Sequence, residues 1–326
     1  MNRTLQNIVV LTSGGDAPGM NAAIRAVVRT ACYHGLQVYG SKAGYQGLVD
    51  QTLIPLGPES VANCIQYGGT ILKADRCSAF YESDIRARCR QFLKEKKIDG
   101  MIVIGGNGSL MGATLLAEEG GPAVIGIPGT IDNDVPGTEY TIGFDTARNT
   151  ALLAIDKIRD TASSHNHHFL VEVMGRNTGF LAVDVGIAGG AEVILIPELD
   201  IPIDVLAKKL LEPKRRKFSS IMVIAEGHQP GRSIALAAQL KAFTHEQYRV
   251  CILGHTQRGG SPTTLDRLMA SQMGFLAVTG LLEGKTRHIT AVNQGTVTLV
   301  NFPNTQHKTR LFTDVALLKC NDILCL

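Results

Sequence analysis

The sequence has no tryptophan, and aromatic residues make up only 5% of its 326 residues. Because single-stranded nucleic acids bind largely by stacking bases on aromatic side chains, this scarcity argues against such a partner. The 32 basic and 29 acidic residues leave a formal net charge of only +3. The basic run 214–217 has no interleaved aromatic residue and is typical of a solvated surface. We therefore expect no nucleic-acid partner, and any anion site should be local.

Paired cysteines and long apolar runs are also missing. The seven cysteines form no Cys-x-x-Cys pair, which favours reduced thiols over a disulfide framework or a zinc site. The apolar stretch 180–197 is interrupted by Asp184 and Glu192, and the first apolar run is too short for a signal peptide. We expect a soluble, cytoplasmic protein with no membrane partner.

Glycine, by contrast, is abundant, with 35 residues that follow no Gly-x-y period. The length and a hydrophobic content of 44% predict two domains or one large α/β unit. Three strand-like segments, residues 8–12, 101–104 and 123–127, each end in a glycine-rich or polar loop. The first two loops precede helical patterns, so this part of the chain predicts parallel strands joined by crossover helices.

The same pattern begins again further along the chain. A helical pattern over 145–159 precedes the strand-like segments 169–173, 193–196, 221–225 and 250–253. A helical stretch over 265–282 is expected to return the chain to the first unit. The predicted fold class is therefore α/β, with a second α/β unit following the first.

Two glycine-rich loops, residues 13–19 (SGGDAPG) and 105–109 (GGNGS), each lead from a strand to a helix. Free N–H groups and the helix dipole at such turns attract an anion, most naturally a phosphate. Neither loop matches Gly-x-Gly-x-x-Gly or Gly-x-x-x-x-Gly-Lys-Ser/Thr, so the sequence supports neither an NAD-dependent dehydrogenase nor an ordinary P-loop NTPase. Tight turns in an α/β fold are the structural alternative.

The segment 130–134 (TIDND) places Asp132 and Asp134 two residues apart at a strand end. One carboxylate can accept a proton while the other holds a metal ion, and Thr130 offers a hydroxyl to the same ligand. A turn rich in Asx residues is the alternative. Arginines near later strand ends, such as Arg176, supply forked donors that suit a phosphate-bearing small molecule.

Five segments, in order along almost the whole chain, together resemble the bacterial 6-phosphofructokinase family. They are TSGGDAPGMNAAIRAVVR (12–29), GGTILKADRC (68–77), PGTIDND (128–134), VEVMGR (171–176) and GHTQRGGSP (254–262). The resemblance implies transfer of the γ-phosphoryl group of ATP, with Mg²⁺, to the 1-hydroxyl of fructose 6-phosphate in glycolysis. It also implies a homotetramer with shared active sites.

The resemblance further implies two similar three-layer α/β/α domains with mainly parallel sheets. Residues 1–143 and 256–307 would form the ATP-binding domain. Residues 144–255 and 308–326 would form the fructose 6-phosphate-binding domain.

Site residues carry over by position. The catalytic residues would be Asp132, as base, with Thr130, Asp134, Arg176 and Arg76. ATP would contact Gly15, Arg76, Cys77, Gly106, Asn107, Gly108 and Ser109. Fructose 6-phosphate would contact Thr130, Ile131, Asp132, Met174, Gly175, Arg176, Glu226, His255 and Arg258, with His167 and Arg249 from a neighbouring subunit. Mg²⁺ would contact Asn107 and Asp134. An ADP or phosphoenolpyruvate effector would contact Arg25, Arg29, Arg159, Gly190, Glu192, Arg215 and Lys217.

Four positions depart from the family pattern. Asn107 stands in place of an aspartate that coordinates Mg²⁺, so metal binding should weaken because one negative charge is lost. His167 stands in place of an arginine that contacts the sugar 6-phosphate, so affinity should rise as pH falls. Thr52 and Gly57 replace an arginine and an aspartate at effector positions.

Two alternatives stay open beside the ATP-dependent kinase. One is a catalytically weakened paralogue that serves as a regulatory or nucleotide-binding subunit. The other is a pyrophosphate-dependent phosphofructokinase. Because the resembling pyrophosphate enzymes carry aspartate and lysine where this chain has Gly108 and Gly129, the two glycines favour ATP.

Overall fold

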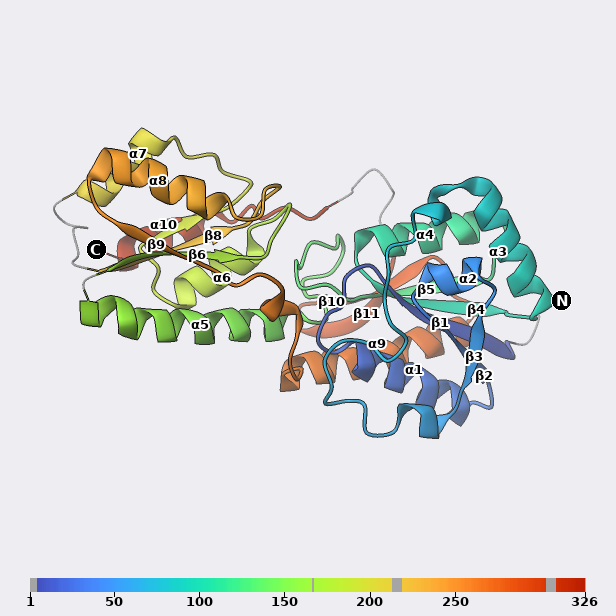
Figure 1. The fold of residues 1–326 in the computed structure, drawn as a ribbon. Coiled ribbons are helices and arrows are strands. Elements are labelled where there is room, and N and C mark those ends of the chain that lie inside the picture. Colours follow the sequence, from blue (N-terminus) through green and yellow to red (C-terminus); the bar gives the residue numbers. More distant parts are fainter. Residues whose placement is uncertain (1–4, 166, 213–218, 303–308, 326) are drawn as a thin grey trace. The chain divides into compact units, whose positions relative to one another are not determined.

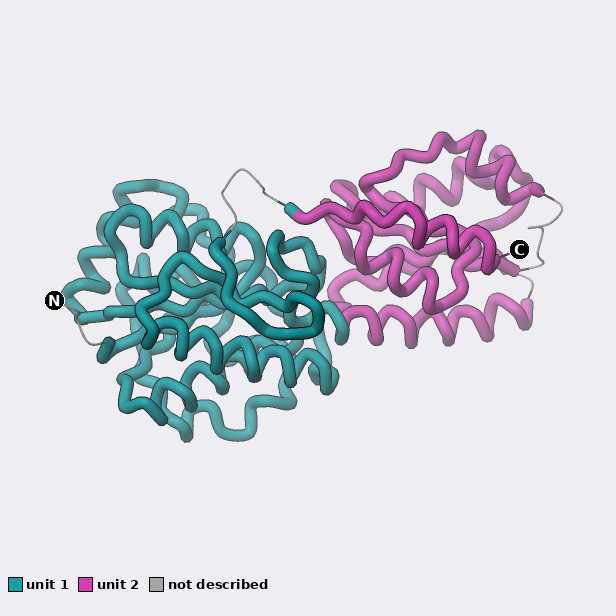
Figure 2. The backbone as a smooth tube through the Cα atoms, turned by 180° about the vertical axis from the view of Figure 1, so that it is seen from behind, with its two compact units in different colours: residues 1–146, 258–309 teal, residues 147–257, 310–326 magenta. Residues whose placement is uncertain are grey.

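The computed structural model describes residues 5–165, 167–212, 219–302 and 309–325, which divide into two compact units (Figure 2). Unit 1 comprises residues 1–146 and 258–309, and unit 2 comprises residues 147–257 and 310–326. The expected domain boundaries, after residues 143, 255 and 307, fall close to these.

A seven-stranded sheet forms the centre of unit 1 (Figure 1). In order across the sheet, its strands are β11 (Thr296–Asn301), β10 (His288–Asn293), β5 (Ala123–Pro128), β4 (Gly100–Gly105), β1 (Asn7–Ser13), β2 (Gln37–Ser41) and β3 (Leu53–Leu56). The inner strands run parallel, whereas the edge strands β3 and β11 pair antiparallel with their neighbours. Strands β1 and β4 are almost entirely buried because apolar side chains meet helices on both faces of the sheet.

Helices cover both faces of this sheet. α1 (Met20–Tyr33) packs against α9 (Thr264–Leu282) on one face, and α3 (Ser83–Glu95) and α4 (Asn107–Glu118) lie on the other (Figure 1). On the α3–α4 side, one apolar cluster joins side chains of β1 and β4 to those of both helices. The shorter helical segments are α2 (Tyr45–Val49), η1 (Pro58–Val61) and η2 (Ser78–Tyr81).

Unit 2 is built on a four-stranded parallel sheet. Its strands, in order, are β7 (Val193–Leu195), β8 (Ser220–Ala225), β6 (His168–Val173) and β9 (Tyr248–Ile252). Its helical segments are α5 (Phe144–His165), which begins in unit 1, α6 (Phe180–Ala188), α7 (Ile203–Leu211), α8 (Arg232–Thr244), η3 (Gly254–Arg258), which ends in unit 1, and α10 (Val315–Leu324). In Figure 1, α7 and α8 lie on one face of the sheet, with α5 and α6 on the other.

The fold class is confirmed: each unit is a three-layer α/β/α arrangement with a mainly parallel sheet. Among the described helices, none combines the length and the apolar character needed to cross a lipid bilayer.

Candidate active site

The carboxyl ends of β1, β4 and β5 lie together at one edge of the sheet in unit 1, where parallel α/β sheets bind ligands. The loops beyond these strands line a pocket of about 750 Å³. The pocket brings together the sequence-predicted residues Gly15, Arg76, Cys77, Gly106, Asn107, Gly108, Ser109, Thr130, Ile131, Asp132, Asp134 and Arg258.

Two glycine-rich loops meet at one end of this pocket. A Cβ atom on Gly105 would lie 2.6 Å from the carbonyl oxygen of Ser13, so the loops approach this closely only because residue 105 is glycine. Gly14 has a φ of +86°, a conformation that favours glycine. α4 begins directly after Gly106, and the N–H groups of its first turn have no partner within the helix. These groups and the helix dipole provide an anion site.

The start of α4 leaves open space within the pocket. A Cβ atom on Gly108 would have no heavy atom within 4 Å, so a longer side chain there would occupy room that a ligand would use. At Gly129 the surroundings are tighter, because a Cβ atom would lie 3.1 Å from Ile104 and 3.3 Å from Met20.

An aromatic wall closes another part of the pocket. The rings of Tyr45 and Phe80 stack with centroids 4.0 Å apart, and the Tyr45 hydroxyl donates to the carbonyl oxygen of Ser109 at 2.5 Å. Burial raises the pKa of Tyr45, which keeps this hydroxyl protonated as a donor. Tyr81 and Met111 also line the pocket. A wall of this kind suits the flat face of a heterocyclic base.

In the loop after β5, both predicted carboxylates line the pocket, and the residue between them stabilises the loop. Asn133 has a φ of +51°, is buried, and donates from Nδ2 to the carbonyl oxygen of Glu139 at 3.1 Å. Asp132 and Asp134 line the pocket on either side of it. Asn133 therefore has the structural role that a turn rich in Asx residues predicts, whereas the flanking aspartates line the pocket.

Burial governs the charge state of both aspartates. It raises the pKa of Asp132, an effect that the positive charge of Arg258 opposes. Burial, with the added charge of Asp132, raises the pKa of Asp134 to about 7. The negative charge of Asp132 thus disfavours ionisation of Asp134, and a bound cation beside the pair would favour the charged forms of both.

Arg258 lies against the first glycine-rich loop. A Cβ atom on Gly15 would be 2.7 Å from Nη1 of Arg258, so the absence of a side chain at residue 15 makes room for the guanidinium group. Within the described part of the chain, Nε of Arg258 is buried without a hydrogen-bond partner. The guanidinium is therefore positioned to meet a negatively charged ligand beside Asp132.

The donor set fits Mg²⁺. Nδ2 of Asn107 donates to the backbone carbonyl oxygen of Asp134 at 3.1 Å, which places the two predicted ligands side by side. The described residues contain no group of three or more His, Cys, Asp or Glu side chains that could hold a metal. Mg²⁺ commonly takes one or two protein oxygens and completes its shell with phosphate oxygens and waters.

Several predicted sugar-phosphate residues lie at the carboxyl ends of the strands in unit 2. Met174, Gly175 and Arg176 follow β6, and the N–H of Glu226, after β8, donates to the carbonyl oxygen of Val173 at 2.8 Å. His255 lies in η3, just after β9, and is exposed, as is Arg176. These residues share one edge of the sheet.

His167 and Arg249 lie at the opposite edge of that sheet. Nη2 of Arg249 donates to Nε2 of His167 at 3.1 Å, where β6 and β9 begin. A strand rises about 3.3 Å per residue, so the length of β6 separates this pair from Arg176 by roughly 17 Å or more. Within one chain, the two groups therefore do not converge on a single small ligand.

The predicted effector residues fall into three sets. In unit 2, Nη2 of Arg159 donates to the carbonyl oxygen of Gly190 at 2.7 Å, and Nη1 lies 3.8 Å from a carboxylate oxygen of Glu192. In unit 1, Arg25 and Arg29 lie on α1. Arg215 and Lys217 lie outside the described residues.

The pocket has the features by which α/β proteins bind phosphate-bearing ligands at the carboxyl ends of parallel strands. Residues 7–281 match the family described as Phosphofructokinase. The chain is 56% identical over 321 residues to the ATP-dependent 6-phosphofructokinase of Coxiella burnetii, and the alignment covers 98% of each chain. It is 49% identical to ATP-dependent 6-phosphofructokinase 1 of Thermus thermophilus, over 99% of this chain and 100% of that one.

Among solved structures, phosphofructokinase of Pichia pastoris in the T-state matches with a TM-score of 0.88 and 33% identity. The alignment covers 99% of this chain but only 37% of that chain. The protein belongs to the phosphofructokinase family, which confirms the resemblance of the five sequence segments.

Proposed function

We propose that the protein is an ATP-dependent 6-phosphofructokinase, which converts ATP and fructose 6-phosphate into ADP and fructose 1,6-bisphosphate. The observation that carries this proposal is the pocket of unit 1, where an aromatic wall, glycine-rich loops and two carboxylates line one space. The curated relatives that match along almost their full length bear the same activity in their names.

Unit 1 would bind the nucleotide. The first-turn amides of α4, with Gly15 and Arg76, would hold the phosphates, while the base would lie against the wall that contains Tyr45 and Phe80. The open space at Gly108 supports ATP over pyrophosphate, because a side chain there would fill part of the pocket. The named relatives favour the same donor.

Asp132 would act as the general base. As the 1-hydroxyl oxygen of the sugar forms a bond to the γ-phosphorus, its proton passes to Asp132 and the bond to the ADP oxygen breaks. Arg258 favours the ionised form of Asp132 that this step requires. Arg76 and Arg176 would stabilise the charge of the transferring group.

Asn107 and Asp134 would hold Mg²⁺, partly through waters. The ion neutralises phosphate charge when bound, and the charge of Asp134 is the main contribution of the protein to its binding. Because Asn107 supplies a dipole and no full charge, we propose that the metal binds more weakly than it would to two carboxylates.

Met174, Gly175, Glu226 and His255 would bind the sugar phosphate from unit 2. The separation of His167 and Arg249 from those residues supports a site completed by a neighbouring subunit, within a homotetramer. An ADP or phosphoenolpyruvate effector near Arg159 and a cytoplasmic location remain predictions.

The proposal is tested by measuring ADP formation from ATP with and without fructose 6-phosphate, in the purified protein and in the Asp132→Asn variant. We expect turnover that needs both substrates in the wild type and a large loss in the variant, with nucleotide binding retained. Nucleotide binding without fructose 6-phosphate-dependent turnover in the wild type would favour the weakened paralogue, for which Asn107, His167 and Thr52 are the motivating residues.

A further inference from the structure

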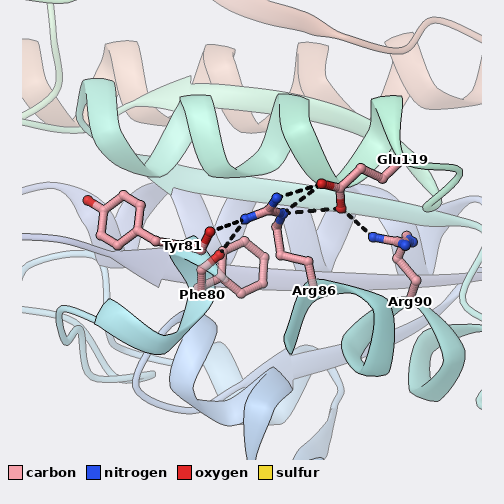
Figure 3. A network of polar contacts seen from close by, with 5 residues as sticks. All are labelled: Phe80, Tyr81, Arg86, Arg90 and Glu119. Carbon is pink, nitrogen blue, oxygen red and sulfur yellow. Dashed lines mark hydrogen bonds and ion pairs between the residues drawn. The ribbon is translucent and has the colours of Figure 1, made fainter. Parts of the chain in front are cut away.

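Glu119, the residue that follows α4, joins two arginines of α3 (Figure 3). Oε1 of Glu119 accepts from Nη2 of Arg86 at 2.6 Å and from Nε at 2.9 Å. Oε2 accepts from Nη1 of Arg90 as well. Because the Arg86 side chain is only 9% exposed, its charge is compensated mainly by this carboxylate.

The other side of the Arg86 guanidinium group binds the short η2 helix. Nη1 donates to the carbonyl oxygens of Phe80 at 3.0 Å and Tyr81 at 2.7 Å, as Figure 3 shows. Arg86 therefore connects the end of α4 to the backbone of η2 through forked, charge-assisted hydrogen bonds. The contact with Arg86 lowers the pKa of Glu119, so the pair is ionised at neutral pH.

The helix η2 supplies Phe80 and Tyr81 to the aromatic wall of the pocket. The Phe80 ring stacks on Tyr45, and the Tyr45 hydroxyl is bonded to Ser109 in the first turn of α4. A continuous set of contacts thus runs from Glu119, at the end of α4, back to the phosphate loop at its start. Arg86, Phe80 and Tyr81 line the pocket, while Glu119 is not among its lining residues.

We propose that Glu119 is a positioning residue for nucleotide binding, which holds the Phe80–Tyr81 backbone through Arg86 and so sets the affinity of the pocket for the base of the nucleotide. The inference rests on the proposed function, because that function identifies the ligand of the pocket as ATP. Without the carboxylate, Arg86 keeps a buried charge that lacks its partner and no longer holds both carbonyl oxygens in place.

The test compares Glu119→Gln with Glu118→Gln, a matched change at an exposed neighbour whose carboxylate lies 3.9 Å from Nη1 of Arg287. Binding of ADP and of tripolyphosphate is measured by calorimetry, which requires no turnover. Tripolyphosphate has no base and reports on the phosphate loops alone. For Glu119→Gln we expect ADP to bind about tenfold more weakly, the ratio that 1.4 kcal/mol produces, with tripolyphosphate binding changed less than about twofold.

In steady-state assays, the same variant should raise the KM for ATP and leave the KM for fructose 6-phosphate and kcat unchanged. Glu119→Asp, which keeps the charge, should restore part of the ADP affinity. Unchanged ADP binding in Glu119→Gln overturns the inference, and so does an equal loss of ADP and tripolyphosphate binding.

If Glu119→Gln does not fold, Glu119→Asp carries the same test with a smaller expected loss, because the shorter side chain keeps the charge but reaches Arg86 less well. A wild-type protein that binds ADP without phosphorylating fructose 6-phosphate would contradict the proposed function and leave the binding comparison valid.

Discussion

Asn107→Asp is the substitution that most directly probes the metal site. Asn107 is the first residue of α4 and lines the pocket. Its Nδ2 donates to the backbone carbonyl oxygen of Asp134 at 3.1 Å. The change removes that donor, which is worth about 1 kcal/mol, and adds a negative charge beside the buried Asp134. Two unit charges about 5 Å apart repel by about 3 kcal/mol at an effective dielectric constant of about 20.

The ligand-free variant should therefore be less stable than the wild type by about 2–4 kcal/mol above neutral pH. Saturating Mg²⁺ should remove that deficit, because the same charge then attracts the cation. In a titration of turnover against free Mg²⁺ at fixed ATP, we expect the midpoint to fall by about tenfold or more. Asn301→Asp, at an exposed position in unit 1, controls for the added charge. An unchanged Mg²⁺ midpoint with unchanged stability would show that residue 107 does not contact the metal.

Three further predictions concern the charged groups of the two units. Asp132→Asn should lower kcat by about 10²–10⁴, the usual contribution of a general base, with the affinity for ADP retained in calorimetry. Because the folded state raises the pKa of Asp134 from 3.8 to about 7, the ligand-free protein binds more protons than its unfolded chain between these values. Its stability should fall as pH rises through 7, and Asp134→Asn should flatten that dependence in metal-free thermal unfolding; an equal slope in both proteins would contradict the assignment. The pKa of His167 is lowered by desolvation and by the charge of Arg249, so the KM for fructose 6-phosphate should improve only at acidic pH. His167→Arg should give a lower KM that does not vary with pH, and parallel profiles in the two proteins would exclude this role.

The inner strands β1, β4 and β5 of the sheet in unit 1 could be predicted from the sequence, because each strand pattern there is followed directly by a turn pattern and, for two of the strands, by a helix pattern. Residues 101–104 and 123–127 were predicted as strands and form most of β4 and β5. The strands on either side of these inner strands, β2, β3, β10 and β11, were not predicted. β3 contains Pro55, which weakens a strand pattern, and β2 ends in a glycine-containing segment.

The sequence of the β10–β11 hairpin contains a turn pattern from which the hairpin could have been predicted. Gln294 and Gly295 both have positive φ, at 51° and 74°, as a two-residue hairpin turn requires. The flanking segments are rich in β-branched residues, which is typical of paired strands.

The glycine-rich loops and the carboxylate pair of the candidate site were predictable because each is local in sequence. The aromatic wall and the contacts of Glu119 were not, since they depend on how α2, η2, α3 and α4 pack. Asn133 shows a related limit: the motif 130–134 contains four pocket-lining residues and one structural residue. Only the φ of Asn133 and its buried hydrogen bond distinguish it from the others.

The central claim is that this pocket transfers phosphate from ATP to fructose 6-phosphate. Phosphorus NMR of the purified protein with Mg²⁺ and fructose 6-phosphate, with ATP or pyrophosphate as donor, tests it directly. We expect fructose 1,6-bisphosphate and ADP to appear together when ATP is the donor, and no bisphosphate to form when pyrophosphate is the donor. The central claim would be contradicted if bisphosphate formed with pyrophosphate but not with ATP, or if no bisphosphate formed with either donor.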